Sequence, residues 1–348
     1  MDSITQITLG GAVGELVLGK KIGNKAVYWG ALAGTIPDLD MVLNPFLDAA
    51  YQVAYHRGFS HSIVFAIVFS PILAYMIQKI HRQQNVKFKD WLHLTFWCLI
   101  THPFLDCFTT YGTQLFQPFS SYPVAFNAIS VIDPAYTIPF LLCLLLVLFL
   151  KRSSSIRKKV LVLGISISSL YLFLTIVNKV YITSVFESSL RQQGIKYSNI
   201  LTIPTFFNNI LWRCVAEEDD FYWEGYYSLF DREKNIQFYL VAKNKNLLEP
   251  YLKDKKLQRL LRFTKNKYSV AQKGNQIIIN DMRFGRIIGW VDPNSDFIFS
   301  FGFYSTEPDI NKKLKIFRVR PSIRINKTIW SQFFARIKGK EFPGLFSN

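Results

Sequence analysis

The chain has 348 residues, of which 50% are hydrophobic and 19% charged, whereas soluble proteins average roughly 25% charged residues. This length suits two domains, and the composition predicts a membrane protein with a soluble part. A net charge of +17 is compatible with nucleic-acid binding, but cytoplasmic loops and contacts with anionic headgroups produce the same excess, so we expect no nucleic-acid partner.

Six apolar segments are predicted in the first 180 residues. The last two approach the roughly 20 apolar residues that a membrane-spanning helix needs. The earlier four are shorter or interrupted by polar residues, as expected of helices that pack around a site. No basic region with a cleavable small-residue site precedes them, so we expect no removable signal peptide. The segments are residues 4–18, 26–37, 63–77, 91–105, 134–150 and 160–178.

The charges of the connecting loops predict the orientation of these segments. Loops 19–25, 79–89 and 151–159 carry an excess of lysine and arginine, whereas loops 38–60 and 110–131 carry little charge. Cytoplasmic loops are the ones enriched in lysine and arginine. With six crossings, all three basic loops would be cytoplasmic, and the polar ends of segments two, three and four would share the extracytoplasmic face.

The composition changes after residue 180, and short alternating runs predict a second domain. Strands are expected at residues 211–217, 222–230, 236–242, 276–280 and 297–303, and helices at 247–263 and 327–337. The fold class is therefore an α-helical polytopic membrane domain at residues 1–180, followed by a mixed α+β, β-rich soluble domain at 181–348. The same count of crossings places this second domain outside the cytoplasm.

Polar residues gather at the end of segment two and the start of segment three. Asp38 and Asp40 follow a proline, in a turn that could aim both carboxylates at one cation. The alternative is a helix N-cap beside a solvated acid. His56 and His61 flank Gly58, which permits a tight turn that brings both imidazoles inward.

A third polar pair, His102 and Asp106, ends segment four. Their spacing of four places both on one face of a helix, although Pro103 suggests a bend, and a purely structural pair is the alternative. The four cysteines lack Cys-x-x-Cys spacing, which argues against a disulfide framework or a zinc knuckle. We therefore predict a metal centre with six candidate ligands: Asp38, Asp40, His56, His61, His102 and Asp106.

This mixture of carboxylates and imidazoles favours zinc, with manganese or iron(II) as alternatives. Six ligands exceed the four of a structural zinc site and would suffice for two ions that share carboxylates. Arg57 would neutralise a substrate phosphate, or alternatively extend toward the lipid headgroups. Glu15, inside an apolar helix, is either near the site or interfacial. Asp133, before Pro134, is a further ligand or a helix N-cap.

The order of these motifs resembles the YdjM-like family of predicted inner-membrane, metal-dependent hydrolases. The resemblance covers about residues 1–180 and implies that the six candidate ligands are metal or active-site positions in a bacterial inner membrane. It rests on Pro-Asp-x-Asp, His-Arg-Gly-x-Ser-His-Ser, His-x-x-x-Asp, Thr-Thr-Tyr-Gly, Gln-Pro-Phe and Asp-Pro in that order. Similarity of this family to zinc-dependent phospholipase C and nuclease folds favours phosphoester substrates.

One position departs from the family pattern. Many members have a Thr-His pair near the N-terminus, where this chain has Thr5 and Gln6. Because an amide is a weaker ligand than an imidazole, one ion would be held less firmly, or Glu15 would compensate.

The predicted function is a membrane-bound hydrolase that activates water with one or two divalent ions and cleaves a lipid or lipid-linked phosphoester. Asp40 and Asp106 are the candidate general bases and Arg57 the candidate clamp for the phosphate. Membrane lipids are the expected partners. The alternatives are a non-catalytic membrane anchor whose C-terminal domain binds a partner, and a metal-ion transporter. Ligands at one face argue against the transporter, because transport sites lie near the bilayer midplane.

Overall fold

The computed structural model describes the chain except for residues 83–84, 305–313, 324–325, 341 and 343–348. The chain divides into two compact units. The helical unit contains Met1–Val42, Tyr55–Val177 and Phe206–Asn208, and the sheet unit contains Leu43–Ala54, Asn178–Thr205 and Asn209–Asn348.

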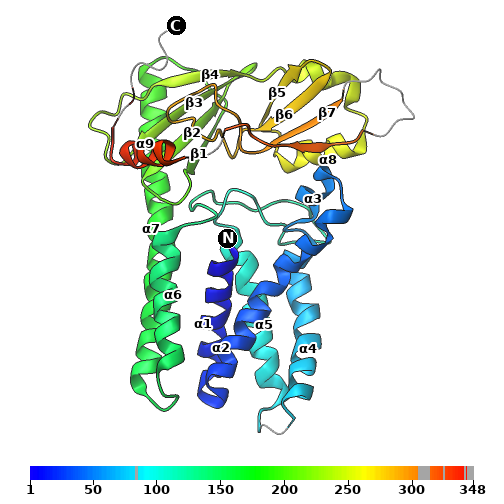
Figure 1. Ribbon diagram of the computed structural model, residues 1–348, viewed down its shortest axis with the longest axis vertical. Coiled ribbons are helices and arrows are strands. Elements are labelled where there is room, and N and C mark those ends of the chain that lie inside the picture. Colours follow the sequence, from blue (N-terminus) through cyan, green and yellow to red (C-terminus); the bar gives the residue numbers. More distant parts are fainter. Residues whose placement is uncertain (83–84, 305–313, 324–325, 341, 343–348) are drawn as a thin grey trace. The chain divides into compact units, whose positions relative to one another are not determined.

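Six helices build most of the helical unit (Figure 1). They are α1 (Ser3–Ile22), α2 (Asn24–Thr35), α4 (Ile63–Ile80), α5 (Phe88–Asp106), α6 (Pro134–Phe149) and the first part of α7 (Ser155–Gln192). The six predicted apolar segments coincide with these helices. Within the described residues, however, only α4 and α7 are long and apolar enough to cross a membrane, while α6 is a shorter apolar helix. Six crossings are therefore not shown.

Glycines allow α1 and α2 to pack backbone against backbone. A Cβ atom at Gly10 would lie 2.4 Å from Gly30 O, and one at Gly14 would lie 2.3 Å from Ala26 O. Any side chain at either position would push the helices apart, as in other small-residue helix interfaces. This contact also holds Gly34, near the end of α2, close to Gln6 and Gly10 of α1.

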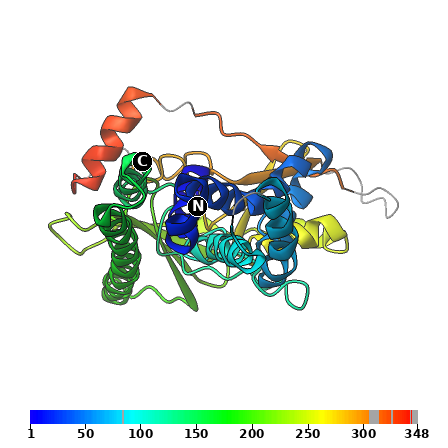
Figure 2. The same cartoon turned by 90° about the horizontal axis from the view of Figure 1, so that it is seen from below.

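Helices α6 and α7 lie side by side, as Figure 1 and the end-on view in Figure 2 agree. Their shared core contains Phe140 and Leu144 of α6 and Leu161 of α7, and it extends to Ala12 of α1. Gly164 permits this close approach, since a Cβ there would lie 2.7 Å from the Cβ of Cys143.

The sheet unit contains two four-stranded antiparallel sheets, with strand orders β1-β2-β3-β4 and β5-β6-β7-β8. The end of α7 packs on the first sheet through Phe186 and Leu190, which contact Trp212 and Tyr227. The first sheet contains β1 (Asn199–Pro204), β2 (Leu211–Glu217), β3 (Phe221–Ser228) and β4 (Phe238–Ala242). The second contains β5 (Tyr268–Lys273), β6 (Gln276–Asp281), β7 (Ser300–Tyr304) and β8 (Phe317–Val319).

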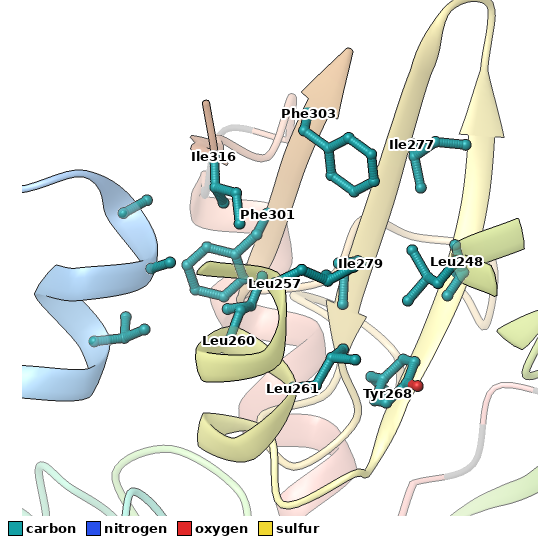
Figure 3. Close-up of a cluster of buried hydrophobic side chains, with 14 residues drawn as sticks. Leu248, Leu257, Leu260, Leu261, Tyr268, Ile277, Ile279, Phe301, Phe303 and Ile316 are labelled. Atoms are coloured by element: carbon teal, nitrogen blue, oxygen red, sulfur yellow. The ribbon is translucent and has the colours of Figure 1, made fainter. Parts of the chain in front are cut away.

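One face of the second sheet is covered by helices (Figure 3). Phe301 and Ile279 of the sheet contact Leu257 and Leu260 in a buried cluster that also includes Ala50. The covering helices are α8 (Lys255–Phe263), the 3₁₀ helix η3 (Lys245–Tyr251) and α3 (Ala49–Tyr55).

Several predicted elements differ from the observed ones. The predicted helix at 247–263 is two helices, because Asp254 caps α8 by accepting hydrogen bonds from Lys256 N and Leu257 N. Strands β1, β5 and β8 and the short helix α3 were not predicted. The predicted strands β2 and β6 and the final helix α9 (Lys327–Ile337) are confirmed to within one residue.

Candidate metal centre

The first ligand candidate, Asp38, follows directly from the end of α2. The chain continues there as the 3₁₀ helix η1 (Ile36–Phe46), which contains both Asp38 and Asp40. Asp38 Oδ1 lies 3.3 Å from His61 Nε2 and 3.5 Å from His102 Nε2. Hydrogen bonds from His102 and His61 hold the pKa of Asp38 well below its usual range although burial opposes them, so this carboxyl is ionised.

His61 is placed by a tight turn in front of α4. Arg57 has a φ of +58°, in the left-handed region, and it is followed by Gly58 and the single 3₁₀ turn η2 (Phe59–His61). Ser62 then caps α4 by accepting a hydrogen bond from Phe65 N. Burial lowers the pKa of His61 to about 4, which leaves a neutral imidazole with a lone pair for a metal at pH 7.

His102 and Asp106 occupy the last turn of α5, one helical turn apart, with His102 Nε2 3.6 Å from Asp106 Oδ2. The other ring nitrogen of His102, Nδ1, donates a hydrogen bond of 2.5 Å to Gly34 O. A backbone carbonyl in this role fixes the tautomer and turns Nε2 toward the ligand group. The close packing of α1 on α2 therefore orients a side chain of α5.

The four residues form one group whose ligand atoms lie within 4.8 Å of one another. The distances from the two Nε2 atoms to each other and to the two carboxylates run from 3.2 to 3.6 Å. Metal–ligand bonds of about 2.0–2.1 Å in a tetrahedron give ligand–ligand distances of about 3.3–3.4 Å. Five of the six ligand–ligand distances thus fit a single tetrahedral ion of zinc size, and the sixth, between the carboxylates of Asp38 and Asp106, is at most 4.8 Å.

The two carboxylate oxygens of Asp106 have different neighbours. Its Oδ2 atom is buried and, within the described part of the chain, makes no hydrogen bond. Its Oδ1 atom accepts hydrogen bonds from Gln6 Nε2, at 3.0 Å, and from the N-terminal ammonium group of Met1. The guanidinium of Arg57, whose Nε atom lies 3.2 Å away, offsets the charge of Oδ2, and the oxygen keeps lone pairs that a metal ion could use.

Asp40 and His56 lie behind His61 instead of joining the four. His56 Nδ1 is 3.0 Å from Asp40 Oδ1, and Asp40 Oδ2 accepts a hydrogen bond of 2.9 Å from Ser60 Oγ. The same oxygen is 3.6 Å from Nδ1 of His61, the ring nitrogen that faces away from the ligand group. Asp40 therefore orients His61 from outside, as carboxylates behind metal-binding histidines do.

Arg57 is buried against Asp106, which is incompatible with the alternative in which it extends to the headgroups. Its Nε atom is 3.2 Å from Asp106 Oδ2, and its Nη1 atom donates a 2.6 Å hydrogen bond to Thr109 Oγ1. The guanidinium lies over the Tyr111 ring, 5.0 Å from its centroid. The ligand group thus has a fixed positive neighbour.

The three additional candidates lie outside the ligand group. Glu15 forms a buried ion pair with Arg157 at 2.6 Å. Asp133 caps α6 by accepting from Ala135 N and Tyr136 N, and it accepts a further hydrogen bond from Tyr171 Oη. Gln6 donates to Asp106 and to His102 O, so it supports the ligands without being one of them.

Residues 1–182, slightly more than half of the chain, match the family described as YdjM inner membrane protein. The chain is 36% identical over 144 residues to the uncharacterized protein YfhP of Bacillus subtilis, covering 38% of this chain and 42% of that protein. It is 32% identical over 102 residues to the inner membrane protein YbcI of Escherichia coli, covering 28% of this chain and 57% of that protein. The chain thus spans about half of each relative, and no solved structure matches it.

Proposed function

Because the chain belongs to the family of YdjM inner membrane proteins, we propose that its helical unit is a membrane-bound, metal-dependent hydrolase that cleaves a phosphoester. The observation that carries this proposal is the grouping of Asp38, His61, His102 and Asp106, whose ligand atoms lie within 4.8 Å of one another. Two imidazoles and two carboxylates favour zinc over calcium, with manganese and iron(II) as alternatives. A second ion would need Asp40 and His56, which are used to orient His61 instead.

A divalent ion held by these four residues would act as a Lewis acid and lower the pKa of its bound water toward neutrality. The protein residues would supply charge and proton transfer around it. Arg57, fixed by Thr109 and Tyr111, would offset negative charge on a phosphate next to Asp106. His56 is the partly exposed histidine of the site, and Asp40 holds its Nδ1, so we assign proton transfer to this pair.

We also propose six membrane crossings with the metal centre on the extracytoplasmic side. The turns between α1 and α2, α4 and α5, and α6 and α7 gather at one end of the helical unit (Figure 1). These turns carry the three basic loops, and the last turn of α5 lies at the opposite end. The positive-inside rule assigns the basic end to the cytoplasm. The sheet unit would then be extracytoplasmic as well.

A lipid or lipid-linked substrate is supported by the loop beside the site. Residues 107–132 contain no charged residue and no histidine. Within it Phe119 is 87% exposed and Tyr122 68% exposed, a combination typical of the membrane interface. Ile63 N, at the start of α4, donates a hydrogen bond to Leu115 O, so this loop is tied to the end of a candidate membrane-spanning helix.

Elemental analysis of detergent-purified protein, combined with a phosphoesterase assay, tests the proposal. We expect about one divalent ion per chain, and loss of both ion and hydrolysis in His61→Ala. The matched control is His93→Ala, because His93 is exposed on α5 outside the ligand group. Protein that holds no ion after purification without chelator, or His61→Ala protein with unchanged hydrolysis, would overturn the proposal.

A further inference from the structure

The second sheet has a polar face opposite its helix-covered face. Tyr268 and Ile279 belong to the buried cluster of Figure 3, and side chains alternate between the two faces of a strand, so the residues next to them point to the opposite face. Among these neighbours, Ser269, Asn280 and Ser300 are directly opposed on adjacent strands. They form a row of buried polar side chains across β5, β6 and β7.

This row is hydrogen-bonded but retains unused capacity. Ser300 Oγ donates to Asn280 Oδ1 at 2.8 Å, and Asn280 Nδ2 donates to Ser269 Oγ at 3.4 Å. No described residue accepts the hydroxyl hydrogen of Ser269. Buried polar groups are normally paired, so a row of this kind beneath a covering loop indicates a polar ligand or water above it.

A cavity of about 330 Å³ lies over this row. Its wall includes β4, the loop that carries Arg286 and Phe297, and the end of β8. The volume falls at the lower end of the range for small-molecule sites, roughly 300–1,000 Å³. The cavity is therefore large enough for a small ligand or a lipid headgroup.

The charged residues around the cavity favour an anion. Among the described residues that line it, three are basic, Lys273, Arg286 and Arg320, and one is acidic, Asp296. Asp296 accepts hydrogen bonds from Ser322 N, at 2.8 Å, and from Ser322 Oγ, at 2.5 Å. Ser322 thus partly satisfies the charge of Asp296. The three cations and one anion among the described lining residues sum to a net charge of +2.

Arg286 is the fixed cation of the cavity. Its guanidinium lies 3.9 Å from the centroid of the Phe297 ring, and its Nη1 atom donates a 2.6 Å hydrogen bond to Ser295 O. Its Nε atom is buried and makes no hydrogen bond to the described residues, and it forms an ion pair with Glu224 Oε2 at 3.9 Å, which offsets part of the positive charge. Nη2 of Arg286, by contrast, is not buried and makes no hydrogen bond to the described residues, so it is the donor that a ligand oxyanion could use.

We propose that this cavity binds a phosphate monoester, either free in solution or as a lipid headgroup. A phosphate monoester carries about −1.5 to −2 charges at pH 7, which matches the lining charge of +2. Its oxygens would accept from Arg286 and from the hydroxyl of Ser269. Lys273 and Arg320, both exposed at the rim, would attract it.

Calorimetric titration of the full chain in detergent tests this site. Glycerol 1-phosphate probes the free ligand, and phosphatidic acid dissolved in the same detergent, with phosphatidylcholine as its control, probes the headgroup. A chelator is present throughout, so that an ion in the helical unit does not bind the phosphate. The test variant combines Lys273→Gln with Arg320→Gln, two exposed changes that should not affect folding. The control combines Lys253→Gln with Arg262→Gln, which removes the same charge from exposed positions away from the cavity.

We expect saturable binding of one phosphate probe, with a Kd raised at least tenfold in the test variant and unchanged in the control. The probe that binds identifies the source of the ligand. Binding of neither probe, or equal binding by the test variant and the control, would overturn the proposal. Equal competition by malonate, a dianion without a phosphate group, would overturn the assignment to phosphate.

Discussion

His61 Nε2 lies 3.2 Å from His102 Nε2, where η2 meets the last turn of α5. The outer nitrogen of each ring is engaged elsewhere, by Gly34 O for His102 and by Ser60 and Asp40 for His61. Two ring nitrogens can face each other at this distance only with a proton or a cation between them. A metal ion bound at this point would therefore compete with protons, and its binding would be coupled to folding.

Removal of the ion should lower the thermal stability of the protein. An ion present at about 100 times its Kd stabilises the folded state by about 2.7 kcal/mol, so we expect a chelator to lower Tm by roughly 5–10 °C. The His102→Ala variant lacks one ligand and should not hold the ion, so its Tm should equal that of chelator-treated wild type and should not change when chelator is added. His93→Ala should keep the wild-type shift. A wild-type Tm that is insensitive to chelator would argue against a bound ion.

Asp38 and Asp40 should respond differently to the same substitution. Asp38→Asn removes a charged ligand and should abolish stoichiometric binding, whereas Asp40→Asn removes only a group that orients His61. Loss of such an outer partner typically lowers metal affinity about 10–100-fold. Competition with a chromogenic chelator measures both affinities. Asp90→Asn, which affects an exposed pair with Lys21, is the control, and equal losses for Asp38 and Asp40 would contradict this division of roles.

The polar motifs of the sequence predicted which segments meet, because each motif lies at an end of an apolar segment and consecutive segments were expected to alternate in direction. They could not separate Asp40 from Asp38, since that difference depends on which nitrogen of His61 each carboxylate faces. The partner of Glu15 was equally hidden, because Arg157 follows it by 142 residues. Gly34 contributes only a carbonyl oxygen, which no side-chain pattern can indicate. The absence of charged residues from 107–132 can be read from the sequence. The link of this loop to α4 cannot, because it is a backbone hydrogen bond.

Glu217 should make the stability of the sheet unit depend on pH. Burial raises the pKa of this carboxyl, but hydrogen bonds from Lys243 and Lys267 outweigh burial and lower it below the ordinary value of 4.5. A lowered folded pKa contributes stability above the unfolded pKa, and this contribution is lost as the pH falls through the folded value. The pair is partly exposed, so the contribution is at most about 1 kcal/mol.

Thermal melts of wild type and Glu217→Gln from pH 3 to pH 7 measure this contribution. We expect the wild type to be more stable at pH 7 and the difference to shrink as the pH falls below 4.5. Asp220→Asn, at an exposed carboxylate next to the same hairpin, should melt like the wild type at every pH. A constant difference across the range would show that Glu217 acts through packing and not through its charge.

Glu15 and Arg157 should stabilise the helical unit without affecting the metal centre. Arg157 donates from Nε and Nη2 to the two Glu15 oxygens at 2.6 and 2.7 Å, and it also bonds Asn24 Oδ1 and Leu150 O. Both side chains are at most 6% exposed. Glu15→Gln leaves a buried guanidinium without its counter-charge, and such changes cost about 3–5 kcal/mol.

The double variant Glu15→Leu with Arg157→Met distinguishes a structural pair from a functional carboxylate. Replacing both buried charges with apolar groups avoids the unpaired charge, so it should recover much of the stability that Glu15→Gln loses. Lys21→Gln, in the exposed pair with Asp90, should cost no more than about 1 kcal/mol. Metal content should stay at the wild-type value in all these variants. If Glu15→Gln lost the ion but melted normally, the carboxylate would belong to the site, because a structural ion pair cannot change metal content while leaving stability intact.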